Sequence, residues 1–298
     1  MRGLRSKKVV EKGKAAASSL RQTLESLADP SYAKKTERFF HRSYCESDIF
    51  IGIRMPQCRA AVKAHIGTTT LQQVKELLHD ARHEMRMAGF ISLADVFHSP
   101  AIAPSSWWDT IDQSAEDSDD QKRLHISQLY LAETRYCNNW DLVDCSTNKI
   151  LGETLVRFHA EQLQDYATIT KIEALPDWYQ TLLCSHDLWE TRISIVLLLK
   201  LISTHRSVVY KICLYHLERF DADPSLRCTI KGVVFPSLDL IHKALGWILR
   251  ETGKQNQGDL VAFLEAHATK AHKTTVRYAT EHLDKSKAKR FVNQAKSS

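Results

Sequence analysis

Three short segments of this chain each combine a tryptophan with a charged side chain at helical spacing. In the first, Trp140 and Asp144 stand four residues apart, so on a helix both project from one face. The other two segments each pair a tryptophan with an arginine three residues on: Trp189 with Arg192, and Trp247 with Arg250. An aromatic face beside a carboxylate can receive a cationic group, whereas arginines hold anions. The pattern predicts a cationic surface that binds a polyanion and carries one acid placed for chemistry.

The elements that must position these side chains are helices. Apolar residues recur at helical spacing along most of the chain, and residues 193–201 are apolar nearly all round, as in a helix buried between neighbours. Only 10 Gly and 7 Pro in 298 residues argue against sandwiches and barrels, which need many turns. Helices of moderate length with short breaks favour an all-α, HEAT-like helical-repeat solenoid of antiparallel helix pairs, although no fixed repeat period is evident.

One main domain is expected over residues 29–284. A basic extension, residues 1–28, precedes it, and a basic tail, residues 285–298, follows it. Basic ends often contact nucleic acid or act as import signals, but solvated disordered ends explain the same charges equally well. Two insertions are predicted, near residues 100–122, which include an acidic run, and near residues 221–236, which read as a long loop.

The cysteine pattern carries no sign of a metal site or a disulfide framework. The seven cysteines are scattered, with no C-x-x-C pair and none near a histidine at zinc-ligand spacing. We therefore expect no cofactor and no metal, reduced thiols, and an intracellular protein. The sequence shows no apolar run long enough to span a membrane and no secretory signal. Among intracellular sites the nucleus is favoured over an organelle, and we expect a monomer.

Several longer motifs resemble those of one family. They occur in the family's order between about residue 30 and about residue 283 and are Phe50–Pro56 (FIGIRMP), Asn139–Asp144 (NWDLVD), Leu151–Glu153 (LGE), Leu188–Ile193 (LWETRI) and Ile241–Glu251 (IHKALGWILRE). Taken together, they make the chain similar to the AlkD-like DNA alkylation repair proteins. That resemblance implies a HEAT-like solenoid and a DNA glycosylase that removes cationic alkylated purines, such as N3-methyladenine and N7-methylguanine, from double-stranded DNA.

The resemblance also implies roles for particular residues. Asp144 matches the family's catalytic carboxylate. The aromatics that lie against the sugar-phosphate of the damaged nucleotide match Trp140 and Trp247. The cations that contact the DNA backbone match Arg192, Lys200 and Arg250. No role is carried over to Trp189. The family grips the backbone, and the lesion need not enter a pocket.

A carboxylate and nearby cations suit the cleavage of a glycosidic bond in DNA. A purine alkylated at N3 or N7 is already positively charged, so it leaves without a general acid. What the reaction needs is stabilisation of the oxocarbenium character on the deoxyribose, which a nearby carboxylate such as Asp144 supplies. Arg192 and Lys200 are eight residues apart and are expected near one helix face, as a phosphate clamp requires.

A second segment imitates the Trp-Asp-x-x-Asp spacing. In Ser106–Asp112 (SWWDTID) the acid is Asp112, but the residues after it are acidic and have no apolar face. After Asp144 a helix continues through apolar residues such as Ile150 and Leu155. We therefore favour Asp144. His83-Glu84 opens another helix, where it caps or pairs; no catalytic role is assigned to it.

Each candidate residue also has a structural interpretation. The tryptophans would pack in the core, Asp144 would cap or solvate a helix turn, and the arginines would pair with Glu190 or Glu251. Two other functions therefore stay open. One is a non-catalytic relative that binds distorted or branched DNA, and the other is a helical-repeat scaffold that binds proteins. Retention of both Trp140 and Asp144 favours the glycosylase.

Overall fold

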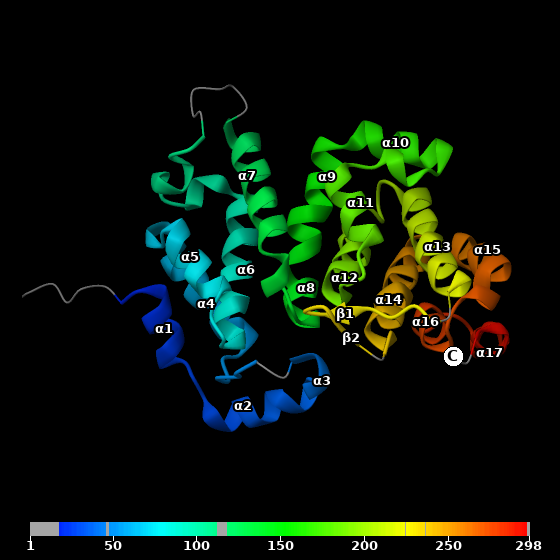
Figure 1. The fold of residues 1–298 in the computed structure, drawn as a ribbon, viewed down its shortest axis with the longest axis horizontal. Helices are drawn as coiled ribbons and strands as arrows, with labels where there is room; N and C mark the ends of the chain where they lie inside the picture. The colour runs from blue at the N-terminus through cyan, green and yellow to red at the C-terminus, as the bar shows by residue number, and fades with distance from the viewer. Residues whose placement is uncertain (1–17, 46–47, 112–117, 224, 236, 297–298) are drawn as a thin grey trace, which may run out of the picture.

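The computed structural model of the protein describes residues 18–45, 48–111, 118–223, 225–235 and 237–296. Helices form almost all of the regular structure, which confirms the all-α prediction (Figure 1). No helix within these ranges is long and apolar enough to cross a membrane.

The N-terminal half contains α1 (Leu20–Ser26), α2 (Pro30–Thr36), the 3₁₀ turn η1 (Glu37–Phe39), α3 (Arg42–Cys45), α4 (Met55–His65), η2 (Ile66–Thr68), α5 (Leu71–Leu78), α6 (His83–His98), η3 (Pro100–Ile102), η4 (Ser105–Trp108), α7 (Ser118–Ala132), η5 (Thr134–Tyr136), α8 (Trp140–Thr147), the π-helical η6 (Asn148–Gly152) and α9 (Glu153–Phe158). The C-terminal half contains α10 (Ala160–Ile169), η7 (Ile172–Ala174), α11 (Asp177–Cys184), α12 (Leu188–Val196), η8 (Leu197–Lys200), α13 (Arg206–Ala222), the strands β1 (Thr229–Ile230) and β2 (Val233–Val234), α14 (Asp239–Gln255), α15 (Gln257–His267), η9 (Ala268–Lys270), α16 (Lys273–Ala279) and α17 (Lys285–Gln294).

The helices pack in two layers along the length of the molecule. One layer runs in the order α6, α8, α12, α14, α16, each helix against the next. Helices of the second layer pack against those of the first: α5 and α7 pack against α6, α11 packs against α12, and α13 and α15 pack against α14 (Figure 1). This side-by-side stacking of helix pairs is the predicted helical-repeat arrangement. The small α2 and α3 lie along the lower edge, beneath α6 and α8 in the view of Figure 1.

Local sequence explains where the central helices begin. The side-chain oxygen of Asn139 accepts a hydrogen bond from the Trp140 amide and caps α8. Asp187 caps α12 by accepting from the amides of Trp189 and Glu190.

In the first layer α14 approaches α16 closely at Gly246, where a Cβ atom would lie 2.4 Å from Cβ of Tyr278. Glycine is therefore required at this crossing, and it brings the next residue, Trp247, beside α16.

Helices also form on both sides of the predicted domain, residues 29–284. Leu20 and Leu24 of α1 are buried and pack with α4, so folded structure begins before residue 29. At the other end α17 covers most of the predicted tail, and its Phe291 is fully buried. Each helix buries apolar side chains, and in α17 these offset a basic composition. The basic residues 1–17 lie outside the described part of the chain.

The two predicted insertions contain more structure than expected. In the first, Trp107 and Trp108 are buried, and the Trp107 indole donates a 2.8 Å hydrogen bond to the carbonyl of Thr69. The second contains the antiparallel pair β1–β2, which was not predicted. Its turn residues Lys231 and Gly232 both have positive φ, as a two-residue hairpin turn requires.

Candidate active site

A surface pocket of about 400 Å³ gathers most of the predicted site residues. Its walls come from η1, α3, α8, α12, α14 and α16, so segments more than 200 residues apart in sequence meet there. The lining residues are Phe39, Tyr44, Trp140, Asp144, Arg192, Leu240, Lys243, Trp247, Arg250 and Tyr278. Five of the six predicted site residues are therefore neighbours in space.

Arg192 holds the Asp144 carboxylate in a fork. Nη2 of Arg192 lies 2.8 Å from both Oδ1 and Oδ2 of Asp144, and Nε donates to Oδ1 at 3.1 Å. The remaining Nη1 donates to the carbonyl of Leu240 at 2.7 Å. The arginine side chain is only 6% exposed, whereas that of Asp144 is 22% exposed. The carboxylate is thus fixed in orientation and still open to the pocket.

The ionisation of Asp144 reflects opposing influences. Burial raises the pKa of Asp144 above its usual value, and the nearby charge of Asp141 raises it further. Arg192 opposes both by its charge and its hydrogen bonds. Among the described residues Oδ2 accepts only from Arg192, which leaves lone-pair capacity for a water molecule or for a developing positive charge.

Two tryptophans flank this carboxylate. Trp140, one turn before Asp144 on α8, is half-buried and stacks on Phe40 with ring centroids 5.2 Å apart. Trp247 on α14 is also half-buried and lines the same pocket. Each indole therefore keeps part of its surface available at the pocket while its other side is supported by the core. The site therefore offers a carboxylate and two indoles in one pocket.

Comparison with models of protein families identifies the family of this chain. The model described as DNA alkylation repair enzyme matches residues 20–283, which is most of the chain. The chain belongs to this family. A search of the curated proteins found no match. Family membership makes DNA alkylation repair the general activity of the protein and DNA its partner.

Cations line the pocket of this family member, but their charges are largely neutralised by neighbouring acids. Arg250 pairs with Glu251 at 3.1 Å and also with Glu281. Lys243 pairs with Asp239 at 2.7 Å, one turn earlier on α14. These pairs are partly exposed, so the acids can yield to a phosphate without leaving a buried charge. Contact of Arg250 with the DNA backbone stays a prediction.

Lys200 lies apart from the other predicted residues. It lines a different cavity, of about 620 Å³, and pairs there with Glu153. The expectation that Arg192 and Lys200 share one helix face is wrong, because the α-helix gives way to a 3₁₀ turn after Val196. Arg192 also differs from a free phosphate clamp, since within the described part of the chain its guanidinium hydrogen-bonds to Asp144 and to the carbonyl of Leu240.

The other tryptophan motifs turn out to be structural. Trp189 is 3% exposed and packs edge-on against Tyr44, so it does not share the pocket with Arg192. In the imitating segment, Trp107 and Trp108 are core residues, and Asp112 lies outside the described residues. The preference for Asp144 over Asp112 stays a prediction.

Half of the residues that line the pocket were not predicted from the sequence. Lys243 stands four residues before Trp247, so helical spacing alone places it on the same face. Phe39, Tyr44 and Tyr278 come from elements distant in sequence, and nothing in the sequence links them to Asp144. Within the described residues no group of three or more His, Cys, Asp or Glu side chains is arranged to hold a metal ion.

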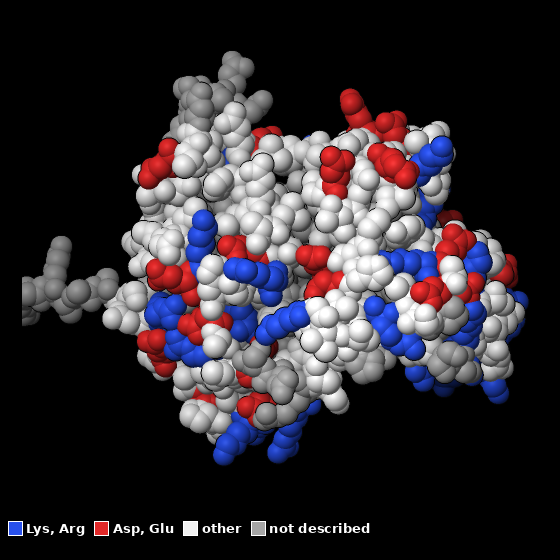
Figure 2. All heavy atoms as spheres, viewed as in Figure 1, with Lys and Arg blue, Asp and Glu red and all other residues white. Residues whose placement is uncertain are grey.

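Charge is distributed unevenly over the face seen in Figure 2. Acidic side chains gather along the upper edge around α10, whereas lysines and arginines are frequent over the C-terminal helices and along the lower edge near α2 (Figure 2). Acids are interspersed among these cations. Positive charge on this face is therefore local rather than uniform.

Proposed function

We propose that this protein is a DNA glycosylase that releases cationic alkylated purines, N3-methyladenine and N7-methylguanine among them, from double-stranded DNA. The observation that carries the proposal is the Asp144 carboxylate, held by the guanidinium fork of Arg192 in an open pocket that Trp140 and Trp247 also line. A protein that only bound DNA would gain nothing from an exposed carboxylate beside phosphates, because like charges repel.

The reaction needs little beyond this arrangement. The bond between C1′ of the deoxyribose and the purine nitrogen breaks, and its electrons neutralise the departing base. Positive charge develops on C1′ and the ring oxygen, where the carboxylate of Asp144 stabilises it. The oxygen of a water molecule then bonds to C1′, and its proton passes to Asp144 or to solvent. No general acid is required, since the leaving purine is already cationic.

The two indoles suit the same transition state. The face of an aromatic ring attracts cationic centres and C–H groups with partial positive charge. Trp140 and Trp247 therefore favour a deoxyribose that becomes positively charged over one that stays neutral. The pocket is open, which fits recognition of the sugar and backbone of a nucleotide and not deep enclosure of a flipped base.

Exposed apolar side chains around the pocket support contact with DNA. Phe39 is 75% exposed and Tyr278 is 37% exposed, although both are large and apolar, and both line the pocket with Asp144. Proteins that distort DNA often present such side chains to the base stack. We propose that Phe39 contacts the duplex next to the lesion while Arg250, Lys243 and Lys200 contact phosphates.

The test is release of base from DNA that carries N7-methylguanine or N3-methyladenine, with wild type compared with Asp144→Asn. Asp112→Asn is the matched control, because it removes the acid of the imitating segment. The proposal predicts release by wild type and Asp112→Asn and none by Asp144→Asn. Salt-sensitive DNA binding without release by any of the three would instead identify a non-catalytic DNA-binding protein.

A further inference from the structure

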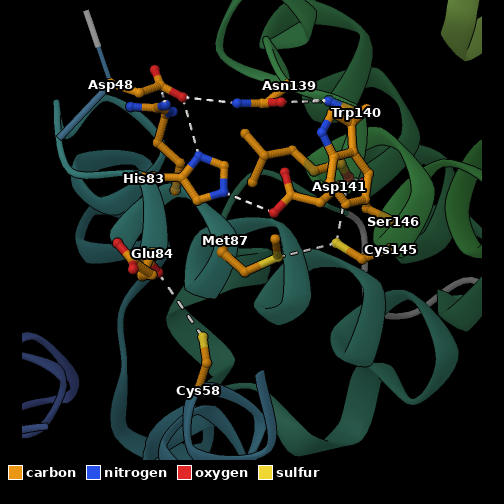
Figure 3. Close-up of polar contacts among 12 residues, drawn as sticks. Asp48, Cys58, His83, Glu84, Met87, Asn139, Trp140, Asp141, Cys145 and Ser146 are labelled. Atoms are coloured by element: carbon orange, nitrogen blue, oxygen red, sulfur yellow. Dashed lines mark hydrogen bonds and ion pairs between the residues drawn. The ribbon is translucent and has the colours of Figure 1, made fainter. Parts of the chain in front are cut away.

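A buried cluster of charged residues lies directly behind the candidate site. His83, at the start of α6, is between two carboxylates: Nδ1 is 3.1 Å from Oδ2 of Asp48, and Nε2 is 2.9 Å from Oδ2 of Asp141 (Figure 3). Arg86 donates to the other oxygen of Asp48 at 2.6 Å. The side chains of His83, Asp48 and Arg86 are at most 5% exposed.

This geometry fixes the charge of His83. A neutral imidazole has one N–H and one lone pair, so one of its nitrogens would face a carboxylate oxygen with no hydrogen between them. Only the imidazolium donates at both nitrogens. With His83 charged, two cations balance two anions in the cluster; with His83 neutral, a buried negative charge would be left over.

The cluster reaches the start of α8 by three routes. Asp48 accepts a 3.1 Å hydrogen bond from the amide of Asn139, the residue that caps α8 and binds the Trp140 backbone N–H. Asp141, in the first turn of α8, is bound by His83 itself. Phe40 stacks on Trp140 and lies 5.2 Å from the His83 ring, centroid to centroid.

We propose that the His83 imidazolium is a positioning residue for the candidate active site: by bridging Asp48 and Asp141 it fixes the first turn of α8, and so the directions in which Trp140 and Asp144 face the pocket. The proposal rests on the glycosylase function proposed above. His83 does not line the pocket and touches no substrate in this scheme.

The bridge has an electrostatic consequence for Asp144. Asp141 stands three residues before Asp144 on α8, and its negative charge raises the pKa of Asp144. The cation of His83 neutralises Asp141 at close range. Without it, two carboxylates on one helix turn would repel each other, and Asp144 would hold a proton to a higher pH.

The groups that surround His83 keep it protonated at neutral pH. Asp48 and Asp141 face its two nitrogens, Arg86 acts on it through Asp48, and the rings of Phe40 and Phe50 cover it. The neighbouring Glu84 is turned away and accepts hydrogen bonds from the amides of Ile51 and Gly52. Burial opposes the charge, yet the two carboxylates outweigh it and raise the pKa of His83 to about 9.

The decisive variant is His83→Gln, which removes the cation and can donate to only one carboxylate. His79→Gln is its control, because it breaks an equally short His–carboxylate pair, to Glu133 at 2.8 Å, that does not touch α8. Single-turnover base release and DNA affinity are measured for both on full-length protein. We expect release by His83→Gln to be slowed about 100-fold, with DNA affinity within about threefold of wild type.

A second substitution tests whether the unpaired charge of Asp141 causes the loss in His83→Gln. In His83→Gln/Asp141→Asn the unpaired carboxylate is gone as well, so we expect release to recover by about tenfold over His83→Gln alone. Release by His83→Gln equal to that of wild type and His79→Gln overturns the proposal. So does a loss of DNA affinity with an unchanged single-turnover rate, because the cluster would then serve binding and not the geometry of Asp144.

Wild type alone provides a test that does not depend on folding of a variant. With the uncatalysed release subtracted at each pH, we expect the single-turnover rate to fall as pH rises through about 9, as His83 loses its proton. A level rate up to about pH 10 overturns the proposal. No release by wild type at any pH is a different failure, because it removes the glycosylase function on which the proposal rests.

Discussion

Replacing Arg192 with methionine separates two roles for this residue, a holder of Asp144 and a phosphate clamp. The substitution removes the three hydrogen bonds to Asp144 and the one to the Leu240 carbonyl. Breaking a buried ion pair on one side costs about 3–5 kcal/mol, which lowers Tm by roughly 10 °C in a protein of this size. The fold should survive this loss, and the Asp144 carboxylate should be left buried without a counter-charge.

Two kinetic effects follow. Without the fork the carboxylate is no longer fixed, and a misplacement of about 1 Å lowers the single-turnover rate roughly 100-fold. Because Arg192 lowers the pKa of Asp144, its removal also moves the acid limb of the pH–rate profile to higher pH. Both are measured as base release at saturating enzyme across pH. Arg250→Met is the control, since Arg250 lines the same pocket without a recorded contact to Asp144.

The opposite result would refute this reasoning. If Arg192→Met weakens binding of any DNA sequence and lowers the dependence of affinity on salt, while the rate at saturation and its acid limb stay as in wild type, then Arg192 is a phosphate clamp. Arg250→Met is expected to behave in that second way.

Three further predictions concern residues around the site. The stabilisation from the His83 imidazolium is fully present below its unfolded pKa of about 6.5 and is lost as pH rises through its folded pKa of about 9. The difference between these pKa values corresponds to about 3 kcal/mol, so the stability difference between wild type and His83→Gln, measured by urea unfolding, should shrink by that order at high pH. A pH-independent stability difference would contradict this. Phe39→Ser should weaken DNA binding roughly tenfold without lowering Tm, as expected for loss of an exposed aromatic that stacks on bases, whereas Ile169→Ser, which changes another exposed apolar residue at the end of α10, should alter neither. Lys200→Ala should weaken binding of all sequences alike and reduce the salt slope by about one, with the rate at saturation unaltered; a slower rate at saturation would place Lys200 in the chemistry.

Much of the pocket was predictable because its main residues lie at helical spacing on α8 and α14. Trp140 and Asp144 share a face through a spacing of four, and Trp247 and Arg250 share one through a spacing of three. The same rule was wrong for Trp189, which is buried while Arg192 reaches the pocket. Spacing identifies a shared face of a helix, but it does not say which neighbour covers that face.

The parts of the site that were not predicted depend on contacts between segments that are distant in sequence. His83 was expected only to cap or pair at a helix start, and its partners Asp48 and Asp141 are 35 and 58 residues away. Phe39 and Tyr278 reach the pocket from opposite ends of the chain. The sequence did indicate the terminal helix α1, because Leu20 and Leu24 stand four residues apart, as on one face of a helix. The basic residues near both ends of the chain nevertheless favoured a prediction of disorder there.

The most direct test of the account is a single-turnover measurement of base release from DNA that carries N7-methylguanine, with wild type compared with Asp144→Asn. Asparagine keeps the shape of the side chain and can still accept from Arg192, so folding and DNA affinity should persist. We predict release by wild type and a rate indistinguishable from the uncatalysed one for Asp144→Asn, with DNA binding equal or tighter. Release by Asp144→Asn at the wild-type rate would contradict the assignment of Asp144 as the catalytic carboxylate.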